Sequence, residues 1–205
     1  MSIFTYRTLQ SPAEGAYKEK GSKFLAFAYP VVSETEIKER IDRLKKEYFD
    51  ARHHCFAWVL GPDRSHVRAF DDGEPNHSAG APILGQIRSK GITNVLIVVV
   101  RYFGGVKLGV GGLINAYKAA AEDVLNNSFI VEIEISEMVK VQFDYLILSD
   151  IMKIIKSLGV KIMEQDFTHG GNMKIGVPIS KKEKLTEKFT LLQALGKKIT
   201  WKVED

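Results

Sequence analysis

The sequence predicts an α+β protein built from two domains, residues 1–136 and residues 137–205. Three observations support this prediction. The six-residue apolar run from Val95 to Val100 is typical of a buried strand, and helix-like patterns precede and follow it. All eight arginines lie before residue 102, whereas the part from Glu137 onward holds twelve lysines and no arginine. That second part also shows the order strand, helix, strand, strand, helix, strand.

Strand-like segments begin the first domain, and helices alternate with strands after them. Phe4 and Tyr6 alternate with polar neighbours, and a lysine-rich turn leads into an apolar run at 24–29. Ser33 and Glu36 fit a capping box, in which a hydroxyl and a carboxylate accept from free N–H groups at a helix start. The further predicted elements are the helix after Ser33, strands at 51–60 and 66–70, a helix at 78–91, a strand at 93–100, a helix from Gly112 to about Leu125, and a strand at 129–135.

The stretch from Asp71 to Tyr117 organises this domain. Its central strand ends at Arg101, and two glycine clusters with a lysine between them lead to the next helix. Such a strand–turn–helix unit can point several backbone N–H groups and a helix N-terminus at an anion. The sequence therefore predicts an anion site at this turn. Its residues are Asp71, Asp72, Glu74, Arg101, Gly104, Gly105, Lys107, Gly109, Gly111 and Gly112.

Asp71, Asp72 and Glu74 place three carboxylates within a short segment before Pro75. Such acids can hold Mg²⁺ or serve as an acid and a base. Aspartate and glycine also favour turns, so the same residues fit a turn before the proline. The sequence leaves both interpretations open. We predict no bound metal and no cofactor.

Cys55 and the lysine-rich turn at 18–23 each have two interpretations. Cys55 follows two histidines on a predicted strand, a setting that suits a nucleophile or a metal ligand. Because cysteine is among the most buried residue types, and Phe56 and Trp58 share the strand, we predict a core residue instead. The lysines of the turn can contact phosphate, but a solvated hairpin turn is the preferred interpretation.

The second domain repeats a simple pattern. Alternating apolar residues predict strands at 139–143, 160–167, 175–179 and 199–203, and apolar stripes predict helices at 147–158 and 185–192. Ser180 and Glu183 fit a second capping box. The order βαββαβ is that of the ferredoxin-like split unit.

The composition limits the class of protein. Apolar residues make up 45% of the chain and charged residues 26%, and the formal net charge is +4. No segment approaches the ~20 apolar residues that a membrane helix needs, and no signal peptide is recognisable. The single cysteine excludes an internal disulfide and fits a reducing compartment. We therefore predict a cytoplasmic protein without membrane contact, whose mildly basic charge is compatible with an RNA or ribosome partner.

Several motifs resemble the signature of the YigZ/IMPACT family. They are DDGEP at 71–75, AG-x-PIL at 79–84, VVVRYFGG at 98–105 and LG-x-GGL at 108–113. One segment departs from the family, since Asn76-His77-Ser78 stands where a Ser-Gly-Thr run is usual. The second half also resembles the domain added in bacterial members.

The resemblance implies a fold more firmly than an activity. It implies a first domain similar to the second domain of a small-subunit ribosomal protein, and a second domain similar to an elongation factor G module. It also implies a link to translation, because the eukaryotic relatives restrain the starvation-activated initiation-factor kinase. For the bacterial relatives it implies no settled activity.

Three functions fit the sequence. The preferred one is an RNA- or ribosome-binding protein linked to translation, without a demonstrable catalytic cycle. In it Arg101, Lys107 and the glycine N–H groups contact phosphate. Tyr102 and Phe103, if exposed, stack bases, although both also fit a buried position at the strand end. The second is an enzyme acting on a phosphorylated small molecule or nucleotide, with a metal between the acids and the phosphate, although no nucleophile–base pair can be assigned. The third is a protein-binding regulator, in which the glycines are structural and Arg101 pairs internally with Asp71 or Asp72.

Overall fold

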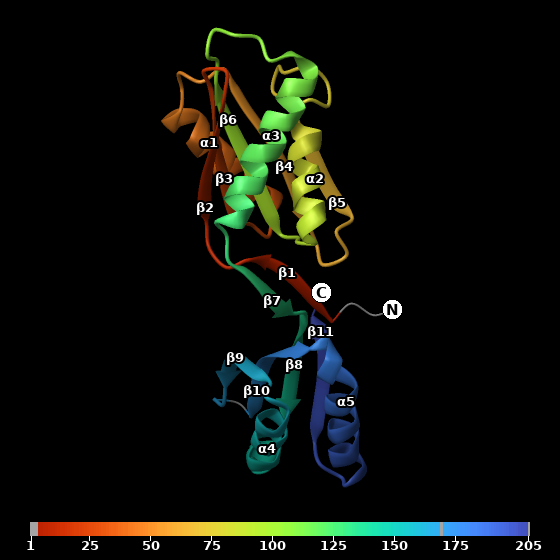
Figure 1. Ribbon diagram of the computed structural model, residues 1–205. Helices are drawn as coiled ribbons and strands as arrows, with labels where there is room; N and C mark the ends of the chain where they lie inside the picture. The colour runs from red at the N-terminus through yellow and green to blue at the C-terminus, as the bar shows by residue number, and fades with distance from the viewer. Residues whose placement is uncertain (1–3, 169, 205) are drawn as a thin grey trace. The chain divides into compact units, whose positions relative to one another are not determined.

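The computed structural model describes residues 4–168 and 170–204 (Figure 1). The chain divides into two compact units. One unit is Thr5–Ile133, and the other holds the described residues from Glu134 onward together with Phe4. The division falls inside the strand that the sequence predicted at 129–135.

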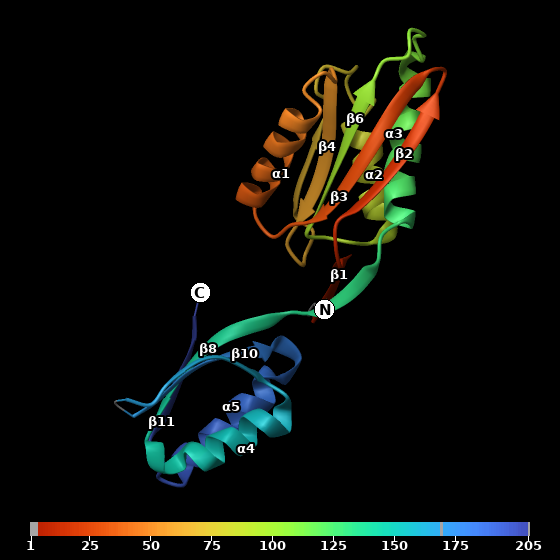
Figure 2. The same ribbon diagram turned by 90° about the vertical axis from the view of Figure 1, so that its left-hand side faces the viewer.

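A five-stranded antiparallel sheet forms the centre of the first unit. Its strand order is β2-β3-β6-β4-β5, so the predicted central strand lies in the middle. Helix α1 covers one face of this sheet, and α2 and α3 cover the other (Figure 2). Strands β1 and β7 form a separate two-stranded sheet. The elements are β1 (Thr5–Leu9), β2 (Ala13–Glu19), β3 (Ser22–Pro30), α1 (Glu34–Glu47), β4 (His53–Leu60), β5 (His66–Phe70), α2 (Gly80–Lys90), β6 (Val95–Tyr102), α3 (Gly109–Asn126) and β7 (Ile130–Glu134).

Side-chain size and pattern explain these layers. Every residue from Val95 to Val100 is buried, because β6 has a helix layer on both faces and successive side chains alternate between them. Ala116, Ala120 and Ala121 of α3 are buried against the sheet, where their small side chains allow close packing. The predicted cap of α1 is present, since the Ser33 hydroxyl accepts a hydrogen bond from the Glu36 amide.

The second unit has a four-stranded antiparallel sheet with the order β11-β8-β10-β9. Helices α4 and α5 both pack on one face of it (Figure 2). The predicted capping box at Ser180 is wrong, because the cap lies two residues earlier, at Pro178, and makes no side-chain hydrogen bond. The elements are β8 (Ser136–Phe143), a 3-10 turn (Tyr145–Ile147), α4 (Leu148–Leu158), β9 (Lys161–Asp166), β10 (Gly171–Pro178), α5 (Ile179–Ala194) and β11 (Ile199–Glu204).

Helices and antiparallel sheets together confirm the predicted α+β class. Over residues 4–168 and 170–204, no helix has both the length and the apolar character needed to cross a membrane.

Candidate functional site

The glycine-rich turn lies at the end of the five-stranded sheet where β6 leads into α3 (Figure 1). The turn packs against the hairpin that joins β2 and β3. The Gly104 amide donates a hydrogen bond to the Ser22 hydroxyl at 3.2 Å. A Cβ atom on Gly104 would lie 1.9 Å from the Gly21 carbonyl carbon, so no larger residue fits there. Gly105 is required for a different reason, because its φ of +87° disfavours residues that carry a Cβ.

Helix α3 starts at Gly109, earlier than the predicted start at Gly112. Gly111 and Gly112 are therefore part of the first helical turn and not of the loop. Leu108 at the cap position provides no side-chain hydrogen bond, and the first turn contains no acidic residue. A Cβ atom on Gly111 would meet no atom within 4 Å. The first N–H groups of the helix thus have no side-chain cap, and the space beside Gly111 is open. This arrangement suits the binding of an anion.

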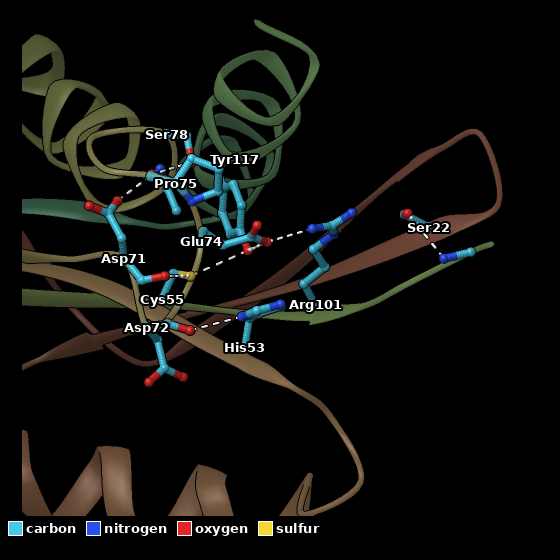
Figure 3. Close-up of polar contacts among 12 residues, drawn as sticks. Ser22, His53, Cys55, Asp71, Asp72, Glu74, Pro75, Ser78, Arg101 and Tyr117 are labelled. Carbon is cyan, nitrogen blue, oxygen red and sulfur yellow. Dashed lines mark hydrogen bonds and ion pairs between the residues drawn. The ribbon is translucent and has the colours of Figure 1, made fainter. Parts of the chain in front are cut away.

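Arg101 lies inside the protein and not on the predicted surface. Its Nη1 atom is 2.6 Å from Glu74 Oε1, and only 7% and 4% of the two side chains are exposed. The Tyr117 hydroxyl donates a hydrogen bond to the same oxygen at 2.8 Å (Figure 3). The guanidinium carbon also lies 5.5 Å from the Phe24 ring centre and 5.7 Å from that of Phe103. The internal partner expected for Arg101 was Asp71 or Asp72, and the structure shows Glu74 instead.

The three carboxylates of DDGEP point to different partners (Figure 3). Asp71 accepts hydrogen bonds from the amides of His77, Ala79 and Gly80. Asp72 accepts from the His54 amide at 2.7 Å, and Glu74 accepts from Arg101 and Tyr117. Within residues 4–168 and 170–204, no group of three or more His, Cys, Asp or Glu side chains is placed to hold a metal ion. The three acids fix α2, β4 and β6 in place, and they do not converge on one point.

Asp71 caps the start of α2. Ser78, at the predicted start of this helix, does not cap it, because its hydroxyl donates instead to the Pro75 carbonyl at 2.6 Å. Burial alone would raise the pKa of Asp71, but the N–H donors around its carboxylate outweigh that effect and lower the pKa. Because Asp71 lies nine residues before Gly80, local sequence patterns do not predict that it caps this helix.

Cys55 and Tyr117 belong to the core, as predicted for the cysteine. The thiol lies 3.0 Å from the Asp71 carbonyl oxygen and 3.3 Å from the Tyr117 hydroxyl. Burial raises the pKa of the Cys55 thiol well above its usual range. Burial also raises the pKa of Tyr117, and the neighbouring thiol and Glu74 carboxylate add to this effect. Neither group ionises near neutral pH, so neither has the character of an activated nucleophile.

The exposed part of the site is a basic tip, which we define as the hairpin turn 20–23 and the loop 103–108. Lys20, Lys23 and Lys107 are exposed on it, and Phe103 exposes 52% of its surface. The sequence pointed to Lys107 and Phe103 but set the hairpin lysines aside as a solvated turn. What unites the two segments is the contact between Gly21 and Gly104, which no sequence pattern indicates.

Comparison with known proteins identifies the family. The Impact N-terminal domain matches residues 20–125. The chain belongs to the IMPACT family. The Escherichia coli protein described as IMPACT family member YigZ is 32% identical, over 83% of this chain and 84% of that protein. A crystal structure of a hypothetical protein superposes over 100% of this chain and 99% of that chain, at 27% identity and a TM-score of 0.75. A structure of the two-domain translational regulator Yih1 is 28% identical over 62% of this chain and 49% of that chain, with a TM-score of 0.35.

Proposed function

We propose that this IMPACT family protein binds RNA or the ribosome through the basic tip and the start of α3, and that it acts in translation in the cytoplasm. The observation that carries the proposal is the uncapped start of α3. Its N–H groups, the open space over Gly111 and the exposed Lys107 together form a site suited to a phosphate group. The exposed Phe103 ring beside it offers a surface on which a base can stack.

The ten predicted site residues divide into two roles in this proposal. Lys107 and the backbone of Gly105, Gly109, Gly111 and Gly112 make the contacts with phosphate, whereas Gly104 joins the loop to the β2–β3 hairpin through Ser22. Asp71, Asp72, Glu74 and Arg101 hold the surrounding elements in position, because each already has a partner inside the protein. A nonspecific RNA ligand suits this arrangement, since contacts to the phosphate backbone orient RNA without reading its sequence.

The proposal also covers the role of the protein in translation and the fold of its second unit. Yih1 is described as a translational regulator, and we extend a role in translation to this chain. We also propose that the second unit is ferredoxin-like, as in an elongation factor G module. Support comes from its βαββαβ order and from the antiparallel sheet order β11-β8-β10-β9.

RNA binding measured by fluorescence anisotropy over a salt series tests the proposal. The variant Lys20→Gln with Lys107→Gln removes two charges from the basic tip. We expect weaker binding and a shallower dependence on salt, by about one unit of log–log slope for each lost phosphate contact. Lys38→Gln with Lys46→Gln is the matched control, since it removes the same charge from the exposed face of α1. Equal losses in both variants would show a general charge effect and no site.

Gly111→Ala separates binding from folding. Alanine favours a helix over glycine by up to about 1 kcal/mol, and its methyl group meets no atom of the protein. We therefore expect a slightly more stable protein that binds RNA more weakly, because the methyl group fills the space proposed for phosphate. Thermal unfolding and anisotropy on one preparation measure both effects. A stabilised variant with unchanged RNA affinity would show that nothing binds over Gly111.

A protein partner is the second candidate function. Val106 and Val110 expose 52% of their surfaces and follow the exposed Phe103 within seven residues of the chain, and exposed apolar side chains are a feature of protein contacts. Salt separates the two candidates, because apolar contacts do not weaken as salt is added whereas phosphate contacts do.

A further inference from the structure

Lysines form a row across the sheet of the second unit. Lys202 of β11 lies opposite Lys140 of β8, and Lys140 lies opposite Lys174 of β10. The neighbours of Lys140 along its strand, Val139 and Val141, are buried in the core that contains α4 and α5. Because side chains alternate along a strand, the three lysines lie on the opposite face of the sheet. We call Lys140, Lys174 and Lys202 the lysine row.

The lysine row is unfavourable for the fold taken by itself. Side chains directly opposite each other on neighbouring strands have Cβ atoms about 4.5–5.5 Å apart, and like charges there destabilise a sheet. Glu204 relieves part of this repulsion, since its carboxylate lies 2.7 Å from the Lys174 ammonium. The hydrogen bond from Lys174 and the charges of Lys140 and Lys202 hold the pKa of Glu204 below its usual range. Among the described residues, Glu204 is the carboxylate that forms an ion pair with the lysine row.

The acids on this face leave the charge of β8 and β11 uncompensated. Glu164 of β9 lies opposite Lys174 and Asp166 of β9 lies opposite Asn172, so the acidic side chains on β9 offset positive charge on that side of the face. Lys140 and Lys202 make no ion pair within residues 4–168 and 170–204. The net positive charge of the row is therefore concentrated on two adjacent strands.

Protection of a sheet edge explains only part of this pattern. Exposed edge strands often carry lysine, which discourages pairing with another chain. Lys202 lies on the edge strand β11 and fits that explanation. Lys140 does not, because β8 is hydrogen-bonded to β11 on one side and to β10 on the other. A lysine between two other lysines on an interior strand requires another reason.

We infer that this face of the sheet binds the phosphate backbone of an RNA duplex. The neighbouring cross-strand row consists of Thr200, Gln142 and Asn172, whose hydroxyl and amide groups can bond to phosphate and ribose, and it ends on β9 at Asp166. The aromatic residue of β11, Trp201, packs on Phe189 in the core with ring centres 5.4 Å apart. No described residue in the two cross-strand rows is aromatic, so the surface suits the paired backbone of a duplex more than stacked single-stranded bases.

This inference extends the proposed function to a second RNA contact, and it uses no residue of the basic tip. The test uses the full chain and a labelled RNA duplex of about 20 base pairs, longer than the ~16 base pairs that a typical duplex-binding domain spans. Lys140→Gln with Lys202→Gln is expected to weaken binding and to lower the salt slope by about two units. Lys153→Gln with Lys156→Gln, on the exposed part of α4, removes the same charge from the other face and is expected to change neither.

Glu204→Gln provides a gain of function. It removes the carboxylate that forms an ion pair with Lys174 while leaving every lysine in place, so duplex RNA is expected to bind more tightly. Unchanged or weaker binding by Glu204→Gln, or equal losses in the two lysine double variants, overturns the inference.

The experiments can reject either proposed RNA surface without rejecting the other. If the basic-tip variant loses affinity and Lys140→Gln with Lys202→Gln does not, the proposed function stands and this inference is wrong. The reverse result supports the lysine row and rejects the basic tip. A wild-type protein that binds no RNA at low salt overturns both.

Discussion

The two units each place a basic residue on an interior strand, and they treat it in opposite ways. Arg101 on β6 is buried, pairs with Glu74 and contacts two aromatic rings. Lys140 on β8 is partly exposed and lies between two further lysines. The guanidinium group is weakly hydrated and suits a buried pair, whereas the ammonium group is strongly hydrated and stays at the surface.

The comparison shows that a basic residue in a glycine-rich motif is not necessarily a ligand contact. Arg101 follows an apolar strand and precedes the glycines, which is where an anion-binding arginine is expected. Its actual partners are internal, and they link β6 to the DDGEP segment. Lys140 sits in an unremarkable alternating strand, yet its charge has no partner within the described residues. The RNA contacts proposed for this protein are therefore assigned to exposed lysines and not to the buried Arg101.

Removing the partner of Arg101 is expected to have the largest effect. Glu74→Ala leaves a buried guanidinium without its carboxylate, and breaking a buried pair in this way typically costs about 3–5 kcal/mol. The Tyr117 hydroxyl loses its acceptor in the same variant. Urea unfolding followed by Trp58 fluorescence, in a Trp201→Phe background, measures the loss in the first unit alone.

An exposed pair in the second unit provides the control. The Lys182 ammonium lies 2.6 Å from the Glu137 carboxylate, but 44% and 31% of the two side chains are exposed. Lys182→Gln is expected to cost at most about 1 kcal/mol, read by Trp201 in a Trp58→Phe background. A loss of similar size for Glu74→Ala would mean that water reaches Arg101 and that the contrast between the units is false.

His54 extends the comparison to a buried base with one unpaired ring nitrogen. Its side chain is 5% exposed, and Nε2 has no hydrogen-bond partner among the described residues. Burial lowers the pKa of His54, and the nearby Asp72 opposes this shift only in part. The unfolded chain, with a histidine pKa of about 6.5, therefore binds a proton that the folded chain does not. Stability is expected to be complete above that pH and to fall as the pH drops through the folded-state pKa.

Urea unfolding of the first unit between pH 7 and pH 5 tests this dependence. His54→Leu is expected to flatten the curve, because the titrating group is gone. His66→Gln on the exposed strand β5 is expected to keep the wild-type slope. The depressed pKa of Asp71 acts in the same direction but below this range, since an aspartate titrates near pH 3.9 when unfolded. A wild-type curve that is flat from pH 7 to pH 5 would show that His54 is hydrated when folded.

Sequence patterns predicted most of the fold because short-range periodicity determines it. The run at Val95–Val100 and the capping box at Ser33 depend on residues close together in the chain, and the structure contains both. The site was harder to predict, because its contacts join distant segments. Asp71 reaches the start of α2, Glu74 reaches Arg101, and Gly21 meets Gly104. A motif search finds these residues but cannot tell a contact with a ligand from a contact with the protein.

The predicted cap at Ser180 fails for a similar reason. Ser180 and Glu183 have the spacing of a capping box, but the helix starts at Ile179, with Pro178 at the cap, so Ser180 lies inside the first turn. The lysine row also could not be predicted from the sequence. Three lysines separated by tens of residues become neighbours only once the register of β8, β10 and β11 is known.

Removing the charge of Lys140 is expected to change the free energy of unfolding least, and to raise it where Glu74→Ala and Lys182→Gln lower it. Lys140→Thr relieves the repulsion within the lysine row and places a β-branched residue on an interior strand. The expected gain is about 0.2–1 kcal/mol of unfolding free energy, read by Trp201 in a Trp58→Phe background. A residue that lowers stability where it stands is typical of a binding surface, where function and stability compete. If Lys140→Thr instead destabilises the second unit, the lysine supports the fold, and the physical reason for an RNA surface on this face is lost.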